Sequence, residues 1–326
     1  MDEIRCIFCK IESDHVVIEE NGYKGRKCPQ CGLIYISPRP SFNEIVALYG
    51  HDNAHISAES HISAGFAKRL YAREHLRVIR SFVKSGALLE VGAGAGYFLD
   101  EARKIGFEPH GLEFNPVQSS YIRNMLKIPC EESSVNETIF GGKLFDVIYH
   151  CDVISHFFDP ISDFKKINEM LKDGSFLVFE TGNLGEVDQA YFKHFHWFQY
   201  PDHLFFFSTD NLISLLETTG FDLVAMYRYS ILPQLWMMKA LAAIKNSVRK
   251  HVFKSDKPKK HSFDAGGADI NSVVNSRSDV KLLIKESIKK SYEYFNFVLR
   301  YKIGRIAPKA SRPQTVIVVA RKRKQD

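Results

Sequence analysis

Two groups of residues in this 326-residue sequence have the types and spacing that binding chemistry requires. The first is Glu90-x-Gly92-x-Gly94-x-Gly96, which ends an apolar run and precedes amphipathic residues. Glycine lets a backbone approach a ligand closely and adopt dihedrals that are closed to other residues. The pattern predicts a buried strand, a glycine turn and a helix, with a nucleotide-like ligand held at the turn.

The second group consists of two C-x-x-C pairs near the N-terminus, Cys6 with Cys9 and Cys28 with Cys31. Four thiolates at this spacing are typical of a tetrahedral Zn²⁺ site whose positions are all filled by protein. A redox C-x-x-C needs only one pair and a thioredoxin-like strand-helix context, which this segment lacks. We therefore expect a structural zinc ribbon that stabilises a small module and does not itself catalyse a reaction.

The formal net charge of +6 conceals an asymmetry along the chain. Residues 231–326 contain 22 Lys and Arg against 7 Asp and Glu, a net +15, whereas residues 1–230 contain 22 against 31, a net −9. An acidic body with a basic C-terminal region suggests an anionic partner such as phospholipid, a phosphate-bearing substrate or nucleic acid. A solvated basic surface without a partner explains the same composition.

We expect no secretory signal and no membrane-spanning segment. The first five residues are acidic and are followed by cysteines, not by the apolar run of a secretory signal. The longest apolar stretch outside the core, residues 231–244, is interrupted by Gln234 and Lys239 and is too short to cross a bilayer. We expect a cytoplasmic protein whose membrane contact, if any, is peripheral at the inner face.

Apolar runs and amphipathic segments alternate regularly after the glycine turn, which predicts an α/β fold: a Rossmann-like, doubly wound, mostly parallel seven-stranded sheet. The expected strands are 88–91, 109–113, one near 128, 145–151, 175–180, 221–229 and 315–320; the expected helices are 98–105, 117–125, 161–171 and 211–219. The expected domains are a zinc ribbon with its linker (1–50), the core (51–230), a basic helical insertion (231–312) and the last core strand with a basic tail (313–326).

The acid that precedes the glycines distinguishes this turn from the G-x-G-x-x-G of dinucleotide folds. The segment from Glu90 through Gly92 and Gly94 to Gly96 resembles the E/D-x-G-x-G-x-G motif of class I S-adenosylmethionine-dependent methyltransferases. The resemblance implies that this turn lies against the methionine and ribose portions of the cofactor.

Other segments extend the resemblance over residues 87–229 and the last strand. Glu113 ends the second expected strand, where the family places an acid that accepts hydrogen bonds from both ribose hydroxyls. The resemblance also assigns Phe114 and Asp152 to the cofactor side. One departure concerns residues 130–133, Cys-Glu-Glu-Ser, where the family often has an Asp for the adenine amine. The resemblance therefore does not assign a residue to the adenine amine.

The ribbon followed by Pro38-Arg39-Pro40-Ser41 narrows the resemblance to a bacterial subgroup, many of whose members are associated with sugar or cell-surface polysaccharide modification. The resemblance implies methyl transfer to a small-molecule acceptor, with a sugar hydroxyl of a cell-surface glycan as our first candidate. One rival is an RNA base methyltransferase that grips phosphates with the ribbon and the basic region. Another is a non-catalytic partner subunit that binds the cofactor. The ribbon carries little positive charge, which argues against RNA.

An alcohol acceptor requires a general base, because its proton must leave as the methyl group arrives. Histidine suits this role since its pKa lies near neutrality. The candidates are His156, past the fourth strand, and His194, His196 and His203 in an aromatic loop. His203 is the first choice because residues 201–204 precede the expected helix in a way that resembles the family and Asp202 could orient an imidazole. The alternative is that His203 only packs or caps the following helix, and for His156 we favour a structural role beside the cofactor over catalysis.

The expected insertion contains two imperfect amphipathic stripes with lysines around them. Basic amphipathic helices can lie on an anionic membrane, and a lipid-linked saccharide would then be a natural acceptor. They can equally cover the substrate side of the core or form a dimer contact. The sequence leaves the oligomeric state open.

Overall fold

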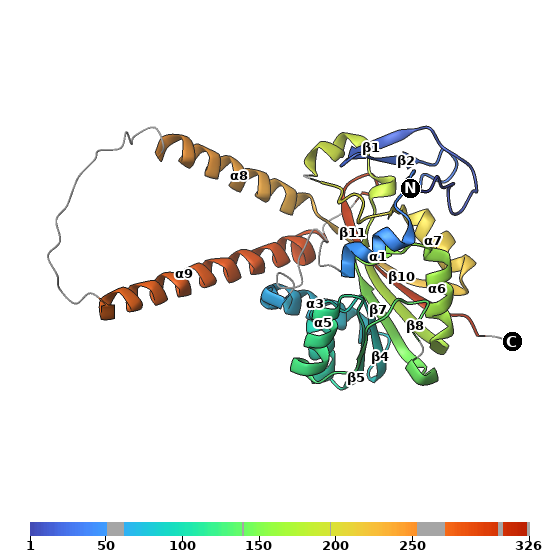
Figure 1. Ribbon diagram of the computed structural model, residues 1–326, viewed down its shortest axis with the longest axis horizontal. Coiled ribbons are helices and arrows are strands. Elements are labelled where there is room, and N and C mark those ends of the chain that lie inside the picture. The colour runs from blue at the N-terminus through green and yellow to red at the C-terminus, as the bar shows by residue number, and fades with distance from the viewer. Residues whose placement is uncertain (51–61, 139, 196, 253–270, 306–308, 325–326) are drawn as a thin grey trace.

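The computed structural model describes residues 1–50, 62–138, 140–195, 197–252, 271–305 and 309–324 (Figure 1). A large sheet has the strand order β10-β11-β8-β7-β4-β5-β6, and a small sheet has the order β1-β2-β3-β9. The large sheet consists of β4 (Gly86–Val91), β5 (Phe107–Leu112), β6 (Cys130–Glu131), β7 (Phe145–Cys151), β8 (Leu171–Gly182), β10 (Phe221–Ser230) and β11 (Gln314–Lys322). The small sheet consists of β1 (Val16–Glu20), β2 (Tyr23–Lys27), β3 (Ile34–Ile36) and β9 (Phe205–Phe206).

The helices cover both faces of the large sheet. They are α1 (Phe42–Gly50), α3 (Gly65–Ile79), α4 (Tyr97–Lys104), α5 (Pro116–Tyr121), α6 (Pro160–Glu169), α7 (Thr209–Thr218), α8 (Leu232–Val252) and α9 (Asn271–Val298). Side chains of α3, α4 and the end of α9 share one core cluster, and those of α6 and α7 share the other. Strands buried on both faces read as continuous apolar runs, which is why the periodicity predicted them.

The predicted seven-stranded, mostly parallel sheet is confirmed. Strands β6, β5, β4, β7 and β8 pair in parallel, whereas β11 is antiparallel to both β8 and β10. The carboxyl ends of the parallel strands therefore meet at one edge, where ligands of such sheets bind.

The third strand lies two residues later than the sequence predicted. Ile128 still belongs to the turn that follows α5, since its N–H bonds to Ile122 O at 3.3 Å after Lys127 takes a left-handed φ of 56°. Pairing with β5 begins only at Cys130, opposite Gly111. The left-handed residue ends the helical turn and delays the strand.

Side-chain caps start the helices directly after strand ends. The Asn115 carboxamide accepts from Val117 N at 3.0 Å and Gln118 N at 3.1 Å, with Pro116 at the first helical position of α5. Ser208 and Asn211 form a reciprocal capping box at the start of α7. Such caps satisfy the free N–H groups of the first turn and fix where each loop ends.

The helical insertion before the last strand is also confirmed. Helices α8 and α9 extend from one side of the molecule, and a π-helical turn, Leu299–Ile303, leads from α9 back toward the sheet (Figure 1). Within the part of the chain that the structure describes, no helix is both long and apolar enough to span a bilayer.

His150 is a buried imidazole near the carboxyl end of β7. Its ring stacks on Phe179 at 4.8 Å between centroids and meets Phe157 and Phe164 edge-on. Neither ring nitrogen has a hydrogen-bond partner among the described residues, and burial lowers the pKa of His150 to about 3. The folded protein therefore holds this ring neutral at pH values where the unfolded chain would protonate it.

We predict that His150→Leu makes stability less dependent on pH. The folded pKa lies below the unfolded value of about 6.5, so the wild type loses stability as pH falls below that value, by about 1.4 kcal/mol between pH 7.5 and 5.5 from this group alone. The variant lacks this loss. Urea unfolding at the two pH values measures it, and an equal pH dependence in both proteins would contradict the assignment.

Candidate functional site

The glycine turn forms a concave backbone between β4 and α4. Gly92, Gly94 and Gly96 have φ values of 67°, 54° and 70°, in the left-handed region that favours glycine. A Cβ at Gly92 would lie 2.6 Å from Val153 Cγ2, and one at Gly96 would lie 2.7 Å from Ile122 Cγ1. Side chains at these two positions would therefore distort the turn and occupy the space around it.

Glu113 lies directly after β5 and joins that strand end to the glycine turn. Its Oε2 accepts from Gly94 N at 2.7 Å, and its Oε1 accepts from Asn115 N at 2.8 Å. Burial raises the pKa of Glu113, while these backbone N–H groups favour its charged form. A carboxylate has further lone pairs, so Glu113 can still accept from the two hydroxyls of a ribose. Phe114 follows it and is half-buried.

Glu90, at the end of β4, has a carboxyl oxygen without a partner. The side chain is 6% exposed, and Oε2 has no hydrogen bond among the described residues. Burial raises the pKa of Glu90 well above its ordinary value, and the Lys68 ammonium opposes that shift. A buried polar atom without a partner costs free energy that an incoming donor would recover. Together with the glycine turn, this oxygen fits a ligand with a hydrogen-bond donor, such as the S-adenosylmethionine that the family resemblance implies.

Asp152 directly follows β7 at the same edge. It has a left-handed φ of 54°, and its N–H bonds to Glu180 O at 2.9 Å. Its side chain is reached by solvent, yet desolvation by the surrounding protein and the nearby Glu180 charge raise the pKa of Asp152. The ends of β4, β5 and β7 thus bring Glu90, Glu113 and Asp152 to one edge of the sheet, as the sequence predicted.

A buried polar network next to Asp152 was not predicted from the sequence. Glu180 on β8 accepts from Arg300 Nη2 at 2.6 Å, Tyr301 OH at 2.7 Å and His75 Nε2 at 2.8 Å. Burial alone would raise the pKa of Glu180, but the charges of Arg300 and His75 outweigh it and lower that pKa to about 2. Through Arg300 and Tyr301, this network connects the end of the helical insertion to strand β8 of the large sheet. Its only sequence signal is an acid within the apolar run of β8.

Asp202 pairs with His156 in the structure. His156 Nδ1 lies 3.0 Å from the Asp202 backbone oxygen and 3.2 Å from its Oδ1. Burial would lower the pKa of His156, but the Asp202 hydrogen bond and charge raise it. The His203 ring stands edge-on to that of His156 with centroids 4.7 Å apart. His196 lies outside the described residues. The imidazole that Asp202 orients is therefore that of His156, with His203 beside it.

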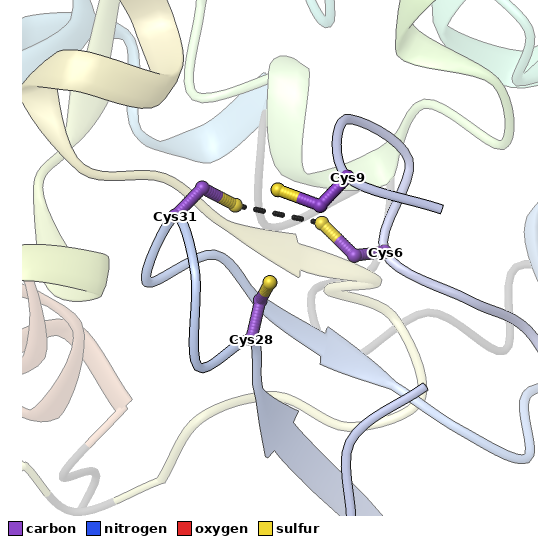
Figure 2. A group of neighbouring side chains, drawn as sticks. All are labelled: Cys6, Cys9, Cys28 and Cys31. Atoms are coloured by element: carbon purple, nitrogen blue, oxygen red, sulfur yellow. Dashed lines mark hydrogen bonds between the residues drawn. The ribbon is translucent and has the colours of Figure 1, made fainter. Parts of the chain in front are cut away.

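The four N-terminal cysteines converge as a metal site requires. Sulfur atoms of Cys6, Cys9, Cys28 and Cys31 all lie within 4.8 Å of one another (Figure 2). Each pair lies on a tight turn: Lys10 N bonds to Cys6 O at 2.9 Å and Gly32 N bonds to Cys28 O at 3.0 Å. Four thiols this close fit a closed tetrahedral Zn²⁺ site, because the cation would compensate the mutual repulsion of the thiolates.

The model of the methyltransferase domain family matches residues 63–226, which is half of the chain. The chain belongs to this family. The match contains the glycine turn, Glu113, Asp152 and the pair His156–Asp202.

Curated relatives resemble part of this chain. A ubiquinone biosynthesis O-methyltransferase of Ruegeria sp. (strain TM1040) is 24% identical over 161 residues, which cover 46% of this chain and 65% of the relative. That of Cereibacter sphaeroides (strain ATCC 17025 / ATH 2.4.3) is 26% identical over 101 residues, covering 29% and 41%. The chain thus matches less than two thirds of either relative's length.

A chain from the complex of the Haloferax volcanii Trm112 methyltransferase activator with a methyltransferase has the same fold. It is 14% identical, with a TM-score of 0.50 over 82% of this chain and 95% of that one. At this identity the likeness concerns the fold alone.

We predict that Cys28→Ser removes most of the bound zinc. A serine hydroxyl at this position is a far weaker ligand than a thiolate, and the ribbon would lose stability with the metal. Zinc content by atomic emission after dialysis measures the loss. Cys130→Ser, outside the cluster, is the matched control and should keep its zinc. One equivalent of zinc in both variants would show that the four thiols are not a metal site.

Proposed function

We propose that this protein transfers a methyl group from S-adenosylmethionine to a small-molecule acceptor. The observation that carries the proposal is the sheet edge that brings together the glycine turn, the Glu113 carboxylate and a Glu90 oxygen that has no hydrogen-bond partner among the described residues. The glycine turn lets the backbone approach a ligand closely, Glu90 offers an acceptor for a donor group, and Glu113 offers lone pairs for the ribose hydroxyls. Phe114 and Asp152 complete the cofactor side.

When bound, S-adenosylmethionine supplies an electrophilic methyl group. The protein has to hold the acceptor in line with that group, and orientation can supply much of the lowering of the barrier. For a hydroxyl acceptor, His156 is the best placed base, because Asp202 fixes its ring through Nδ1 and favours its protonated form once it takes up the proton. His203 lies against this ring and is the second candidate, and His196 is the third.

The acceptor is proposed to be an oxygen atom of a small molecule. The curated relatives are named O-methyltransferases of ubiquinone biosynthesis, which favours a hydroxyl over a nitrogen or carbon acceptor. The ribbon and its Pro-Arg-Pro-Ser linker favour a sugar hydroxyl in cell-surface glycan biosynthesis. An RNA base is less well supported, because the described ribbon surface carries few cations, and a non-catalytic subunit would have no use for the His156–Asp202 pair.

Residues 231–312 are proposed to make peripheral contact with an anionic membrane. Trp236 on α8 and Ile288 on α9 are 63% and 64% exposed, and Phe295 is 50% exposed. Exposed lysines accompany them on α9, among them Lys285 and Lys290. Large apolar side chains beside lysines suit the interface of an anionic bilayer.

Zn²⁺ is proposed to have a structural role only, since the four thiols would fill its coordination sphere.

We predict that Glu113→Gln weakens binding of S-adenosylhomocysteine by about 10- to 100-fold, because hydrogen bonds to a charged acceptor contribute about 1.5–3 kcal/mol. Isothermal titration calorimetry on the zinc-loaded protein measures this change. Glu108→Gln on the same strand removes an equal charge from an exposed side chain and should leave the affinity unchanged. No binding by the folded wild type would refute the proposed function itself.

Incubation with methyl-labelled S-adenosylmethionine and a fractionated lysate of the source cell should place the label in a hydroxyl-bearing small molecule or glycan. Label in the lipid fraction would favour a membrane acceptor, and label in RNA would refute the small-molecule assignment.

Once the acceptor is identified, His156→Asn should lower kcat by about 10²- to 10⁴-fold without changing cofactor affinity. His15→Asn is the control. Wild-type activity should rise with pH through the raised pKa of His156, because only the neutral ring accepts a proton.

A further inference from the structure

The ribbon sheet is completed by a strand from the methyltransferase domain. Strand β9 pairs antiparallel with β3, placing Phe206 opposite Ile34 and Phe205 opposite Tyr35. Ile36 N also donates to Leu204 O at 3.0 Å. The segment 197–206, which we name the bridging loop, therefore belongs to the ribbon sheet at its far end.

The hairpin between β1 and β2 holds the near part of the bridging loop. Both carboxylate oxygens of Glu20 are used: Oε1 accepts from Phe198 N and Oε2 from Tyr200 N, each at 2.8 Å. The side-chain amide of Asn21 donates to Tyr200 O at 2.7 Å. Hydrogen bonds to an ionised acceptor are stronger than neutral ones, so Glu20 holds this backbone firmly through two hydrogen bonds.

Gly25 on the neighbouring strand β2 leaves the space that the Tyr200 side chain occupies. A Cβ at Gly25 would lie 2.1 Å from the Tyr200 hydroxyl, and Tyr200 itself is 2% exposed. The Tyr200 ring thus packs directly on the β2 backbone. Such close contact leaves the loop little room to shift relative to the ribbon.

The other side of the bridging loop contacts the candidate base. Two residues after Tyr200, Asp202 accepts the hydrogen bond from His156 Nδ1, and Leu204 N donates to Ser155 O at 2.7 Å. Two residues span at most about 7 Å of chain, so a displacement of Tyr200 would disturb the position of Asp202.

We infer that Glu20 is a positioning residue for the His156–Asp202 pair: the hairpin of the ribbon sets where the bridging loop places the Asp202 carboxylate. This inference rests on the proposed function, since the pair matters only if His156 takes part in methyl transfer. It gives the ribbon a role in the site although its four cysteines lie in a separate cluster.

The test uses Glu20→Gln in the full-length, zinc-loaded protein. A glutamine offers one acceptor oxygen, and its NH₂ group would face a second N–H donor, so one of the two hydrogen bonds to the loop backbone is lost. Glu19→Gln is the matched control, an exposed neighbour on the same strand with the same loss of charge. Asn21→Gly is the second variant, because glycine tolerates the φ of 52° and removes only the amide.

The first readout is the titration of His156 by NMR with labelled histidine, assigned through His156→Asn. The charged and titratable groups that face His156 include Asp202, Asp152 and the His203 ring. If Asp202 moves away, burial dominates and the His156 pKa falls by about 0.5–1 unit, equivalent to about 0.7–1.4 kcal/mol. Glu19→Gln should leave it unchanged.

A His156 titration that matches the control in both Glu20→Gln and Asn21→Gly would overturn the inference. If Glu20→Gln loses zinc, the result of Asn21→Gly decides by the same criterion. The titration needs no acceptor, so it separates this inference from the proposed function, which S-adenosylhomocysteine binding tests. Once an acceptor is known, Glu20→Gln should lower kcat about 10-fold or more while the cofactor KM stays unchanged.

Discussion

The hydrogen bond from Gly94 N to the Glu113 carboxylate joins the ends of two neighbouring parallel strands, and the proposed cofactor side of the site depends on it. The strand register places Glu90 opposite Gly111 and brings Glu113 next to the glycine turn. Backbone N–H groups of Gly94 and Asn115 supply the donors that hold the carboxylate. Its remaining lone pairs are available to a ligand.

The proposed acceptor side is organised differently, since loops and not strand ends hold it. The bridging loop is fixed by the ribbon on one side and by Ser155 and His156 on the other. Loops need such external contacts to reach the precision that strands have by virtue of their own hydrogen bonds. The ribbon provides them, because β3 pairs with β9 and Glu20 binds the loop backbone.

The sequence predicted features whose signal lies in short, local spacing. The glycine turn, the two C-x-x-C pairs and the alternation of strands and helices belong to this class, and the cysteine cluster and the sheet follow the prediction. The partners of Asp202 and Glu180 were not predictable, because their contacts join residues 46 and 120 positions apart. The sequence left open which imidazole Asp202 would orient, and in the structure its carboxylate lies next to His156.

The position of β11 in the sheet has a consequence for synthesis of the chain. This strand lies between β8 and β10, yet it emerges from the ribosome only after the whole of α8 and α9. Until then the edge of β8 has no hydrogen-bonded neighbour on that side, and β10 has no place in the sheet. An apolar, unpaired strand edge invites association with other chains, so nascent molecules that stall within the insertion would be prone to aggregate.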